Sequence, residues 1–325
     1  MAKVLVTGGC GYIGSQVTHA LSLKGHQVVV YDNLSTGFKD ALLCGETLIV
    51  GDLADRELLN KVFKEHQFDG ILHFAASIVV PESVSNPLKY YSNNTSNLIS
   101  LLQIALEHEV HKIIFSSTAA VYGNGDGKTA FVETQLPAPE SPYGYSKAFS
   151  ERVIFDTSSA SPLRHVVLRY FNVAGADPYG KLGQRSPDAT HLIKIACETA
   201  TGKRASMNVF GNDYDTPDGT CIRDYIHISD LADAHVLSLE YLLSGGESQT
   251  LNCGYGDGYS VLEVLAAIDQ VSDQPVDRVI THRRPGDAVK VLANCEKIHR
   301  VLPFKPKYRD LSAIVGHAYA FEKSL

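Results

Sequence analysis

The chain begins with a strand pattern, a glycine-rich turn and a helix pattern, and this order constrains the fold more than any other feature. Residues 3–6 form a short, mostly apolar run, and a helical pattern continues from the turn to Leu23, where Gly25 ends it. Between them, the glycines fit either GxGxxG, beginning at Gly9, or GxxGxxG, beginning at Gly8. Such glycines allow a tight turn and let the backbone approach a pyrophosphate at a helix N-terminus. We therefore predict a dinucleotide-binding unit here.

A carboxylate after the second strand pattern narrows the choice of dinucleotide. Residues 27–30 form this pattern, and Asp32 follows it, 18 residues after Gly14. At this place an acidic residue binds the ribose hydroxyls of adenosine and repels a 2′-phosphate. We expect NAD as the cofactor, in preference to NADP.

Strand and helix patterns then alternate. Strands are expected at 48–50, 70–74, 112–117 and 165–170, with helices at 55–66, 87–108 and from Tyr143 onward. This alternation predicts an α/β fold, with a Rossmann-type doubly wound parallel sheet in residues 1–171 to which a segment around 223–240 returns. Residues 172–325 have shorter elements, including helices at 192–201 and 261–271. We expect them to form mainly a smaller C-terminal α/β lobe for the substrate.

Composition excludes several other classes of protein. The net charge of −7, without any basic run, argues against a nucleic-acid partner. No apolar run approaches the roughly 20 residues that a membrane helix needs. The six cysteines are scattered, with no CxxC pair and no clustering with histidines, so we expect reduced thiols and no metal site. These features, and a first strand that begins directly at the N-terminus, predict a cytoplasmic protein.

One pair of residues has the spacing of an acid and base. Tyr143 and Lys147 are four residues apart and lie on one face if a helix carries them. A free phenol has a pKa of about 10, and a nearby ammonium lowers it towards neutrality. The spacing alone arises by chance in many chains. Here it follows a predicted strand and Thr118, at the edge of the sheet where such folds bind ligands.

A set of motifs in a fixed order resembles the UDP-glucose 4-epimerases, members of the extended short-chain dehydrogenase/reductase superfamily. The resemblance covers nearly the whole chain. The early motifs are common to the superfamily, whereas LRYFNVAGA and FGNDYDTPDGTCIRDYIH are more specific to the epimerases. The motifs are TGGCGYIGS, YDNLSTG, GDLAD, HFAA, YYSNN, FSSTAAVYG, SPYGYSKAFSE, LRYFNVAGADPYG, VFGNDYDTPDGTCIRDYIHISDLADAH and RRPGD.

The resemblance implies an isomerase that interconverts UDP-galactose and UDP-glucose and keeps NAD bound. Tyr143 takes the proton of the sugar 4-hydroxyl while the C4 hydride passes to NAD, and the hydride then returns to the opposite face of the 4-keto sugar. Lys147 lowers the pKa of Tyr143, and Thr118 hydrogen-bonds the 4-oxygen. These three are the implied catalytic residues.

The resemblance also implies two sets of binding residues. The cofactor set comprises Gly8, Gly11, Tyr12, Ile13, Gly14, Asp32, Asn33, Ser35, Thr36, Gly37, Asp52, Leu53, Phe74, Ala75, Ala76, Asn93, Ser116, Tyr143, Lys147 and Tyr170. The substrate set comprises Thr118, Tyr143, Asn172, His191, Leu192, Asn208, Phe210, Arg223, Arg284, Asp287 and Val291. In the second set, the resemblance places Asn172 and the two arginines on the diphosphate. Phe210 then lies against the uracil and Asp287 near the nucleotide ribose.

Departures from the family sharpen the expected activity. Ala119 and Ala120 stand where sugar-nucleotide 4,6-dehydratases carry acidic residues, so elimination lacks its acid and base. Ile78 replaces a lysine that contacts the cofactor in many members, and His191 replaces a frequent asparagine. Val291 stands where some members have a bulky tyrosine, so we expect N-acetylated UDP-hexosamines to fit as well.

The sequence leaves two alternatives open. The first is another sugar-nucleotide enzyme of the extended family, such as a UDP-uronate 4-epimerase or a dehydratase. The second is a non-catalytic regulator that senses NAD, although such proteins usually lose the tyrosine or the lysine. The implied partners are a UDP-sugar and a second copy of the chain, in a homodimer formed through helices near 94–107 and 143–156.

Overall fold

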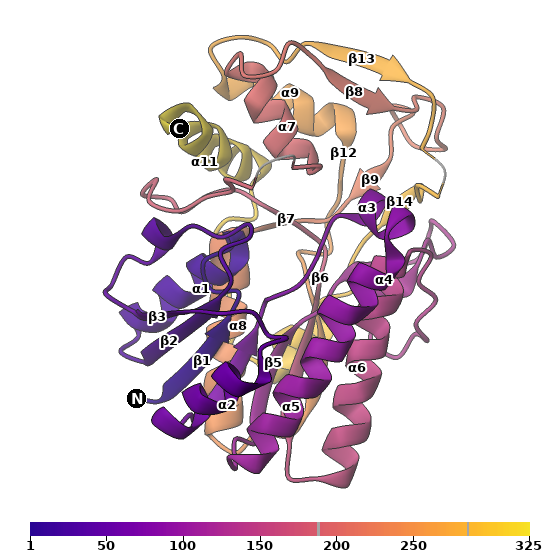
Figure 1. Ribbon diagram of the computed structural model, residues 1–325. Coiled ribbons are helices and arrows are strands. Elements are labelled where there is room, and N and C mark those ends of the chain that lie inside the picture. The colour runs from indigo at the N-terminus through magenta and orange to yellow at the C-terminus, as the bar shows by residue number, and fades with distance from the viewer. Residues whose placement is uncertain (187–188, 285) are drawn as a thin grey trace. The chain divides into compact units, whose positions relative to one another are not determined.

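The computed structural model describes residues 1–186, 189–284 and 286–325 and contains two compact units (Figure 1). Unit 1 comprises Met1–Gly123, Leu136–Arg169 and Ala232–Leu251, and unit 2 comprises Asn124–Gln135, Tyr170–Leu231 and Asn252–Leu325. The predicted domains, 1–171 and 172–325 with a return around 223–240, differ from these units in three places. The second segment of unit 1 ends at Arg169, so Tyr170 and Phe171 belong to unit 2. The returning segment is 232–251, and residues 124–135 belong to unit 2, where Phe131 forms a bridge with Ala293.

Unit 1 is built on a seven-stranded sheet with the order β11-β6-β5-β4-β1-β2-β3. The pairings from β1 to β6 are parallel, so the prediction of a doubly wound parallel sheet is confirmed. The strands are β1 (Lys3–Thr7), β2 (Gln27–Asp32), β3 (Thr47–Val50), β4 (Gly70–His73), β5 (Lys112–Ser116), β6 (Arg164–Tyr170) and β11 (Gln249–Cys253).

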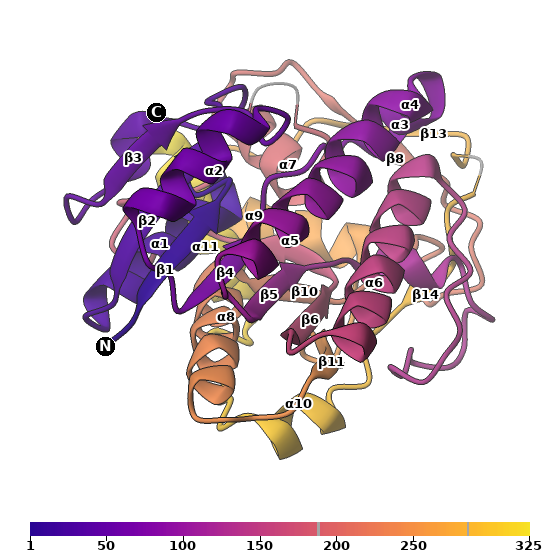
Figure 2. The same ribbon diagram turned by 60° about the horizontal axis from the view of Figure 1, so that its bottom comes forward.

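Helices cover both faces of this sheet, which explains why its central strands are almost wholly apolar. The helices α2 (Arg56–Glu65), α5 (Asn97–Glu107) and α6 (Pro142–Ala160) lie on one face, and α1 (Tyr12–Leu23) and α8 (Ile228–Leu243) on the other (Figures 1 and 2). Buried side chains such as Leu5, Ile71 and Ile113 of the strands pack with Leu98 and Leu101 of α5 in one core.

The start of α6 is fixed by its own sequence. The side chain of Ser141 accepts a hydrogen bond from the backbone N–H of Gly144 at 3.2 Å, and Pro142 occupies the first helical position. Both features favour a helix N-terminus at this point. Tyr143 is therefore the second residue of the helix, next to the edge of the sheet.

The predicted helix at 87–108 is interrupted. It consists of α4 (Pro87–Tyr90), a π-helical turn η2 (Tyr91–Ser96) and α5, and it is preceded by the short helix α3 (Val80–Ser85), which was not predicted. In the π-turn, the side chain of Asn94 accepts from Ser77 N at 2.8 Å and donates to Ser77 O at 2.9 Å. Turns of this type frequently occur at functional sites.

Unit 2 combines short strands with three packed helices, α7 (Leu192–Ala200), α9 (Val261–Val271) and α11 (Leu311–Ser324) (Figure 1). The predicted helices at 192–201 and 261–271 correspond to α7 and α9, whereas α11 was not predicted. The remaining elements are β7 (Asn172–Ala174), β8 (Met207–Phe210), β9 (Ile222–Arg223), β10 (Tyr225–His227), β12 (Tyr259–Ser260), β13 (Arg278–Thr281), β14 (Lys290–Val291) and α10 (Glu296–Val301).

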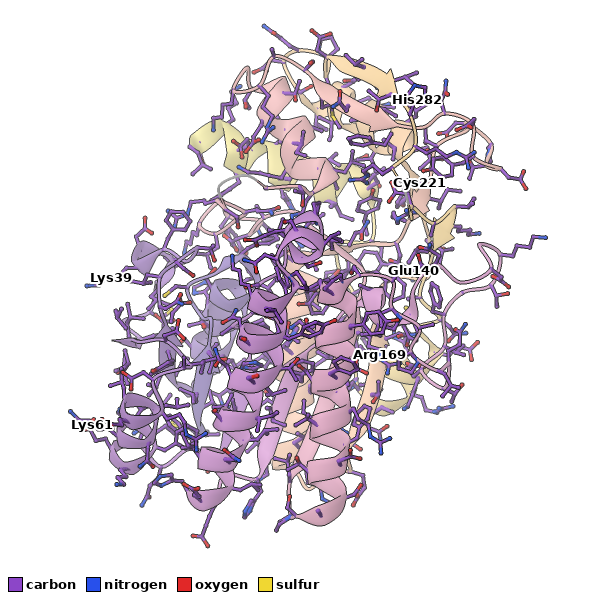
Figure 3. The ribbon with its side chains drawn as sticks, turned by 45° about the vertical axis from the view of Figure 1, so that its right-hand side comes forward. Lys39, Lys61, Glu140, Arg169, Cys221 and His282 are labelled. Atoms are coloured by element: carbon purple, nitrogen blue, oxygen red, sulfur yellow. The ribbon has the colours of Figure 1, made fainter. Side chains whose placement is uncertain are left out.

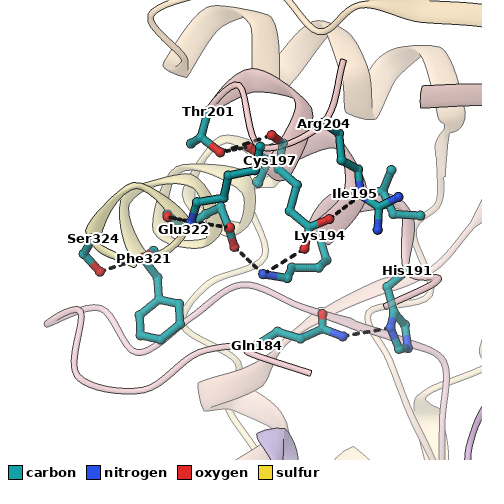
Figure 4. A network of polar contacts seen from close by, with 12 residues as sticks. Gln184, His191, Lys194, Ile195, Cys197, Thr201, Arg204, Phe321, Glu322 and Ser324 are labelled. Carbon is teal, nitrogen blue, oxygen red and sulfur yellow. Dashed lines mark hydrogen bonds and ion pairs between the residues drawn. The ribbon is translucent and has the colours of Figure 1, made fainter. Parts of the chain in front are cut away.

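A buried ion pair joins α7 to α11 in unit 2 (Figure 4). Lys194 Nζ lies 2.5 Å from Glu322 Oε2 and 3.3 Å from Glu198 Oε1. The pair connects the last helix, α11, to α7.

Among the described residues, no helix combines the length and apolar character that crossing a bilayer requires.

Candidate active site

The glycine turn of unit 1 has the shape that a pyrophosphate needs. Gly8 has φ +72°, and an added Cβ would lie 2.6 Å from Ala75 N, while one on Gly14 would lie 2.1 Å from Gly8 O. A side chain at either position would overlap backbone atoms of this unit, so only glycine fits there. A Cβ on Gly11 would meet only Gly8 O, at 3.4 Å. The middle glycine thus leaves open space at the N-terminus of α1, where an anion binds well.

Asp32 is held at the end of β2, beside this turn. Its Oδ2 accepts from Cys10 N at 2.9 Å and its Oδ1 from Leu34 N at 2.8 Å. Leu34 has φ +58°, an uncommon conformation for a non-glycine residue. A carboxylate has about four acceptor positions. Two therefore remain for ribose hydroxyls, and the residues present fit an adenine dinucleotide.

Most of the other predicted cofactor residues follow the strand ends, whereas Asn93 lies in the π-helical turn η2. Asn33 Nδ2 donates to Asp52 Oδ2 at 2.8 Å, and Asn93 Nδ2 donates to Ser77 Oγ at 3.1 Å. The rest are Tyr12 and Ile13 at the start of α1, Ser35, Thr36 and Gly37 after β2, Leu53 after β3, Phe74, Ala75 and Ala76 after β4, and Ser116 at the end of β5, while Tyr170 ends β6 and belongs to unit 2.

The three predicted catalytic residues lie together in unit 1. Tyr143 is buried, and this burial raises its pKa, whereas a hydrogen bond with the Thr118 side chain lowers it. Lys147 is also buried, and its Nζ donates to Ser116 O at 2.8 Å. Burial lowers the pKa of Lys147 to about 8, and the Glu151 carboxylate opposes that shift. The lowering of the tyrosine pKa by Lys147 stays a prediction.

Neighbouring elements hold Tyr143 and Thr118 in place. Tyr90 packs edge-on against Tyr143 with 6.4 Å between ring centroids, and its hydroxyl donates to Val79 O at 2.6 Å. Thr118 caps the short helix η3 (Ala119–Tyr122), because its Oγ1 accepts from Ala120 N at 3.1 Å. Neither position after Thr118 carries a carboxylate, so this turn supplies no acid or base for an elimination.

In unit 2, four predicted substrate residues form one cluster. The Arg284 guanidinium carbon lies 4.6 Å from the centroid of the Phe210 ring, and Arg284 Nε donates to Asp287 Oδ2 at 3.0 Å. Arg223 Nη2 lies 3.9 Å from Asp287 Oδ1. An aromatic face beside two arginines suits a base and a diphosphate, since guanidinium groups match phosphate geometry.

The remaining predicted substrate residues of unit 2 occupy different elements. Asn208 shares the more exposed face of β8 with Phe210, as expected for residues two apart in a strand. Val291 pairs with Arg223 in β14 and β9. The others are Asn172 at the start of β7, His191, whose Nδ1 lies 2.9 Å from Gln184 Nε2, and Leu192 at the start of α7.

Comparison with known proteins identifies the family of this chain. A family model described as the NAD dependent epimerase/dehydratase family matches residues 4–254. The chain belongs to this family.

Individual members of the epimerase/dehydratase family resemble the chain over its full length. A UDP-glucose 4-epimerase from Azospirillum brasilense is 50% identical, covering 99% of this chain and 92% of the relative. The solved UDP-glucose 4-epimerase from Brucella ovis, in complex with NAD, has a TM-score of 0.96 at 39% identity, covering 99% of both chains. The solved UDP-Glc/GlcNAc 4-epimerase from Campylobacter jejuni has a TM-score of 0.88 at 45% identity, covering 100% of both. The predicted resemblance is confirmed.

The sequence analysis missed one buried group in this epimerase/dehydratase family member. Glu151 and Arg169 form a buried ion pair in unit 1, with 2.5 Å between Oε2 and Nη2 (Figure 3 labels Arg169). Two signals were present in the sequence. Glu151 continues the interval of four from Tyr143 and Lys147, and Arg169 is a charged residue inside an apolar strand pattern.

Proposed function

We propose that this chain is an NAD-dependent UDP-hexose 4-epimerase, an isomerase that interconverts UDP-galactose and UDP-glucose. The observation that carries the proposal is the buried hydrogen bond between Tyr143 and Thr118, with Lys147 one helical turn away and Ala119 and Ala120 next to it. This arrangement supports one proton transfer and lacks the carboxylates of an elimination. The named relatives with nearly full coverage are UDP-glucose 4-epimerases.

NAD is the resident cofactor in this proposal. The residues that hold it are Gly8, Gly11 and Gly14 at the pyrophosphate and Asp32 at the adenosine ribose, as the fit of the turn and the carboxylate supports. When bound, NAD accepts the C4 hydride and supplies it again to the opposite face of the sugar.

The residues of unit 1 manage the proton. Tyr143 removes the proton of the 4-hydroxyl and returns it after the hydride has come back. Thr118, already bonded to Tyr143, donates to or accepts from the same 4-oxygen. Lys147 places a positive charge near the phenolate and favours it.

The residues of unit 2 bind the nucleotide part of the substrate. Arg223 and Arg284 neutralise the diphosphate, with Asn172 as a further donor, while Phe210 stacks on the uracil. Asp287, which bonds Arg284 here, accepts from the nucleotide ribose. His191 and Leu192, at the N-terminus of α7, also contact the diphosphate.

The substrate range extends to N-acetylated UDP-hexosamines. Val291 presents a small side chain beside Arg223, where a tyrosine would take up more room. The Campylobacter jejuni relative, at 45% identity, is named a UDP-Glc/GlcNAc 4-epimerase. The second activity depends on this one position and is separate from the chemistry at C4.

The active form is a cytoplasmic homodimer. Exposed apolar side chains gather on the outer helices of unit 1, namely Leu88 of α4, Ile99 of α5 and Tyr145 and Phe149 of α6. The Tyr145 and Phe149 rings are 5.9 Å apart. All six cysteines are free, which suits a reducing compartment. Sedimentation should show a dimer that Phe149→Glu dissociates, and a monomeric wild-type protein would contradict this arrangement.

Two measurements on the purified protein test the function. Its absorbance should show bound NAD(H), and it should convert UDP-galactose to UDP-glucose without added cofactor. A UDP-uronate tested in parallel separates the nearest alternative enzyme. Absence of conversion, with bound NAD(H) present, would replace the proposal with a different reaction of the same family or a regulator that senses NAD.

A further inference from the structure

Three buried residues of α6 follow one another at intervals of four. Tyr143, Lys147 and Glu151 lie along one face of this helix, turned towards β5. The proposed function uses the first two. Glu151 is the most buried of the three and has no part in that chemistry so far.

The Glu151 carboxylate bonds Ser117, the residue between the end of β5 and Thr118. Its Oε1 accepts from Ser117 Oγ at 2.5 Å and from Arg169 Nε at 3.0 Å, and its Oε2 accepts from Arg169 Nη2 at 2.5 Å. The arginine contact is bidentate, which fixes the orientation of both groups. Ser117 immediately precedes Thr118, so this hydrogen bond to Glu151 restrains the backbone next to Thr118.

Arg169 reaches the other side of Thr118. Its Nη1 donates to the Tyr122 hydroxyl at 3.0 Å, and its guanidinium carbon lies 4.8 Å from the Tyr122 ring centroid. Tyr122 ends the short helix η3 that Thr118 caps. The ion pair therefore contacts Ser117, just before Thr118, and Tyr122, at the far end of the short helix that Thr118 caps, while Glu151 lies one helical turn from Lys147.

A gain in folding stability is a weak explanation for a buried ion pair. Apolar residues of similar volume often serve a protein interior as well as a buried ion pair does, because desolvation offsets the attraction. We therefore look for a role of the Glu151–Arg169 pair in the chemistry of the neighbouring residues. We propose that Glu151 and Arg169 are positioning residues that keep Lys147 charged and hold Thr118 in bonding distance of Tyr143. This inference rests on the proposed function and deepens it.

The other groups that face Lys147 do not duplicate this role. On α6 the other such group is Tyr143, one turn before Lys147. From β4, His73 faces it as a neutral ring, because burial and the Lys147 charge lower the His73 pKa to about 3. From β5, the Phe115 ring lies 4.8 Å from Nζ. Glu151 is the carboxylate that opposes the lowering of the Lys147 pKa by burial.

Glu151→Gln tests the inference with little change in shape. The variant removes one negative charge and leaves Arg169 uncompensated, so both Lys147 and Tyr143 should lose their protons at lower pH. We expect the whole kcat profile to move to lower pH by about one unit, the usual size of such a charge effect. The Lys147 pKa of about 8 would fall by that unit, so the charged fraction at pH 8, and kcat with it, should fall about fivefold. KM should stay within about twofold, since the nucleotide-binding residues are unchanged.

A double variant guards against loss of folding. Glu151→Gln with Arg169→Met removes both charges, and replacing a whole buried pair is often tolerated. Its kcat profile should lie between those of the wild type and the single variant. A matched control is Glu322→Gln, which breaks the buried pair with Lys194 in unit 2 (Figure 4). It should lower stability and leave the kcat profile in place.

A spectroscopic reading separates this inference from the proposed function. The phenolate absorbance of Tyr143, taken as the difference between each protein and its Tyr143→Phe counterpart, requires no turnover. It should titrate at lower pH in Glu151→Gln than in the wild type. Lack of epimerisation by the wild type would reject the proposed function alone. A phenolate titration and a pH profile that both coincide with the wild type would overturn the positioning role.

Discussion

Each unit holds a cluster of charged side chains, and the two clusters differ in exposure. In unit 1, Lys147, Glu151 and Arg169 are 3%, 1% and 3% exposed. In unit 2, the side chains of Arg223, Asp287 and Arg284 are 15%, 21% and 50% exposed. Buried charges take their protonation state from their neighbours, whereas hydrated charges exchange partners at little cost. The first cluster suits proton transfer, and the second suits reversible binding of an anion.

The largest effect on kcat should come from replacing Tyr143, which lies one helical turn before Lys147 of the buried cluster. Tyr143→Phe removes the proton carrier and should lower kcat by about a thousandfold or more, as for loss of a general acid and base. Initial rates with UDP-galactose measure it. Tyr145→Phe, two residues along the same helix and exposed, is the matched control. Near-normal turnover by Tyr143→Phe would remove this tyrosine from the chemistry.

Lys147→Met should separate activity from stability. We expect kcat to fall about a hundredfold. The wild-type ammonium is buried with its pKa lowered from 10.5 to about 8, so below pH 8 its burial costs about 3 kcal/mol of folding free energy. The methionine variant should therefore be the more stable protein at pH 7.

The pH dependence of folding stability tests the sign of this difference between Lys147→Met and the wild type. Between pH 8 and 10.5 the unfolded wild type binds more protons than the folded one, so wild-type stability rises with pH. The advantage of the methionine variant should shrink across that window. Urea unfolding at a series of pH values measures both proteins, and an advantage that stays constant would contradict the buried-charge account.

In the exposed cluster, loss of a charge should weaken binding and spare the chemistry. Arg284→Met should raise KM for UDP-galactose by about tenfold or more, the loss of a hydrogen bond to a charged group, with kcat within about threefold. Arg283→Met is the matched control, because Arg283 stacks on Tyr214 and bonds Asp213. Equal effects from both arginines would show that general charge, and not a specific site, attracts the substrate.

The smallest effect should concern the sugar. Val291→Tyr should lower kcat/KM for UDP-N-acetylglucosamine about tenfold relative to UDP-galactose, as expected when a binding site loses room for a small group. Val291→Ala keeps the room and should preserve the ratio. An unchanged ratio in the tyrosine variant would exclude Val291 from sugar selection.

Much of unit 1 could be predicted because its signals are local. Strand and helix periods and the glycine turn act within a few residues, and they specified the order of elements. The helix expected from Tyr143 onward begins at Pro142. The spacing of Tyr143 and Lys147 placed both on one face for the same reason. The resemblance added the binding residues, which local patterns do not reveal.

The tertiary structure alone decided which distant groups meet. The π-turn at Asn94 depends on bonds to Ser77, and residues 124–135 join unit 2 because Phe131 pairs with Ala293. The pairing of Glu151 with Arg169 likewise arises only when α6 packs on β6. Burial and long-range pairing set the protonation of charged groups, and a linear pattern contains neither.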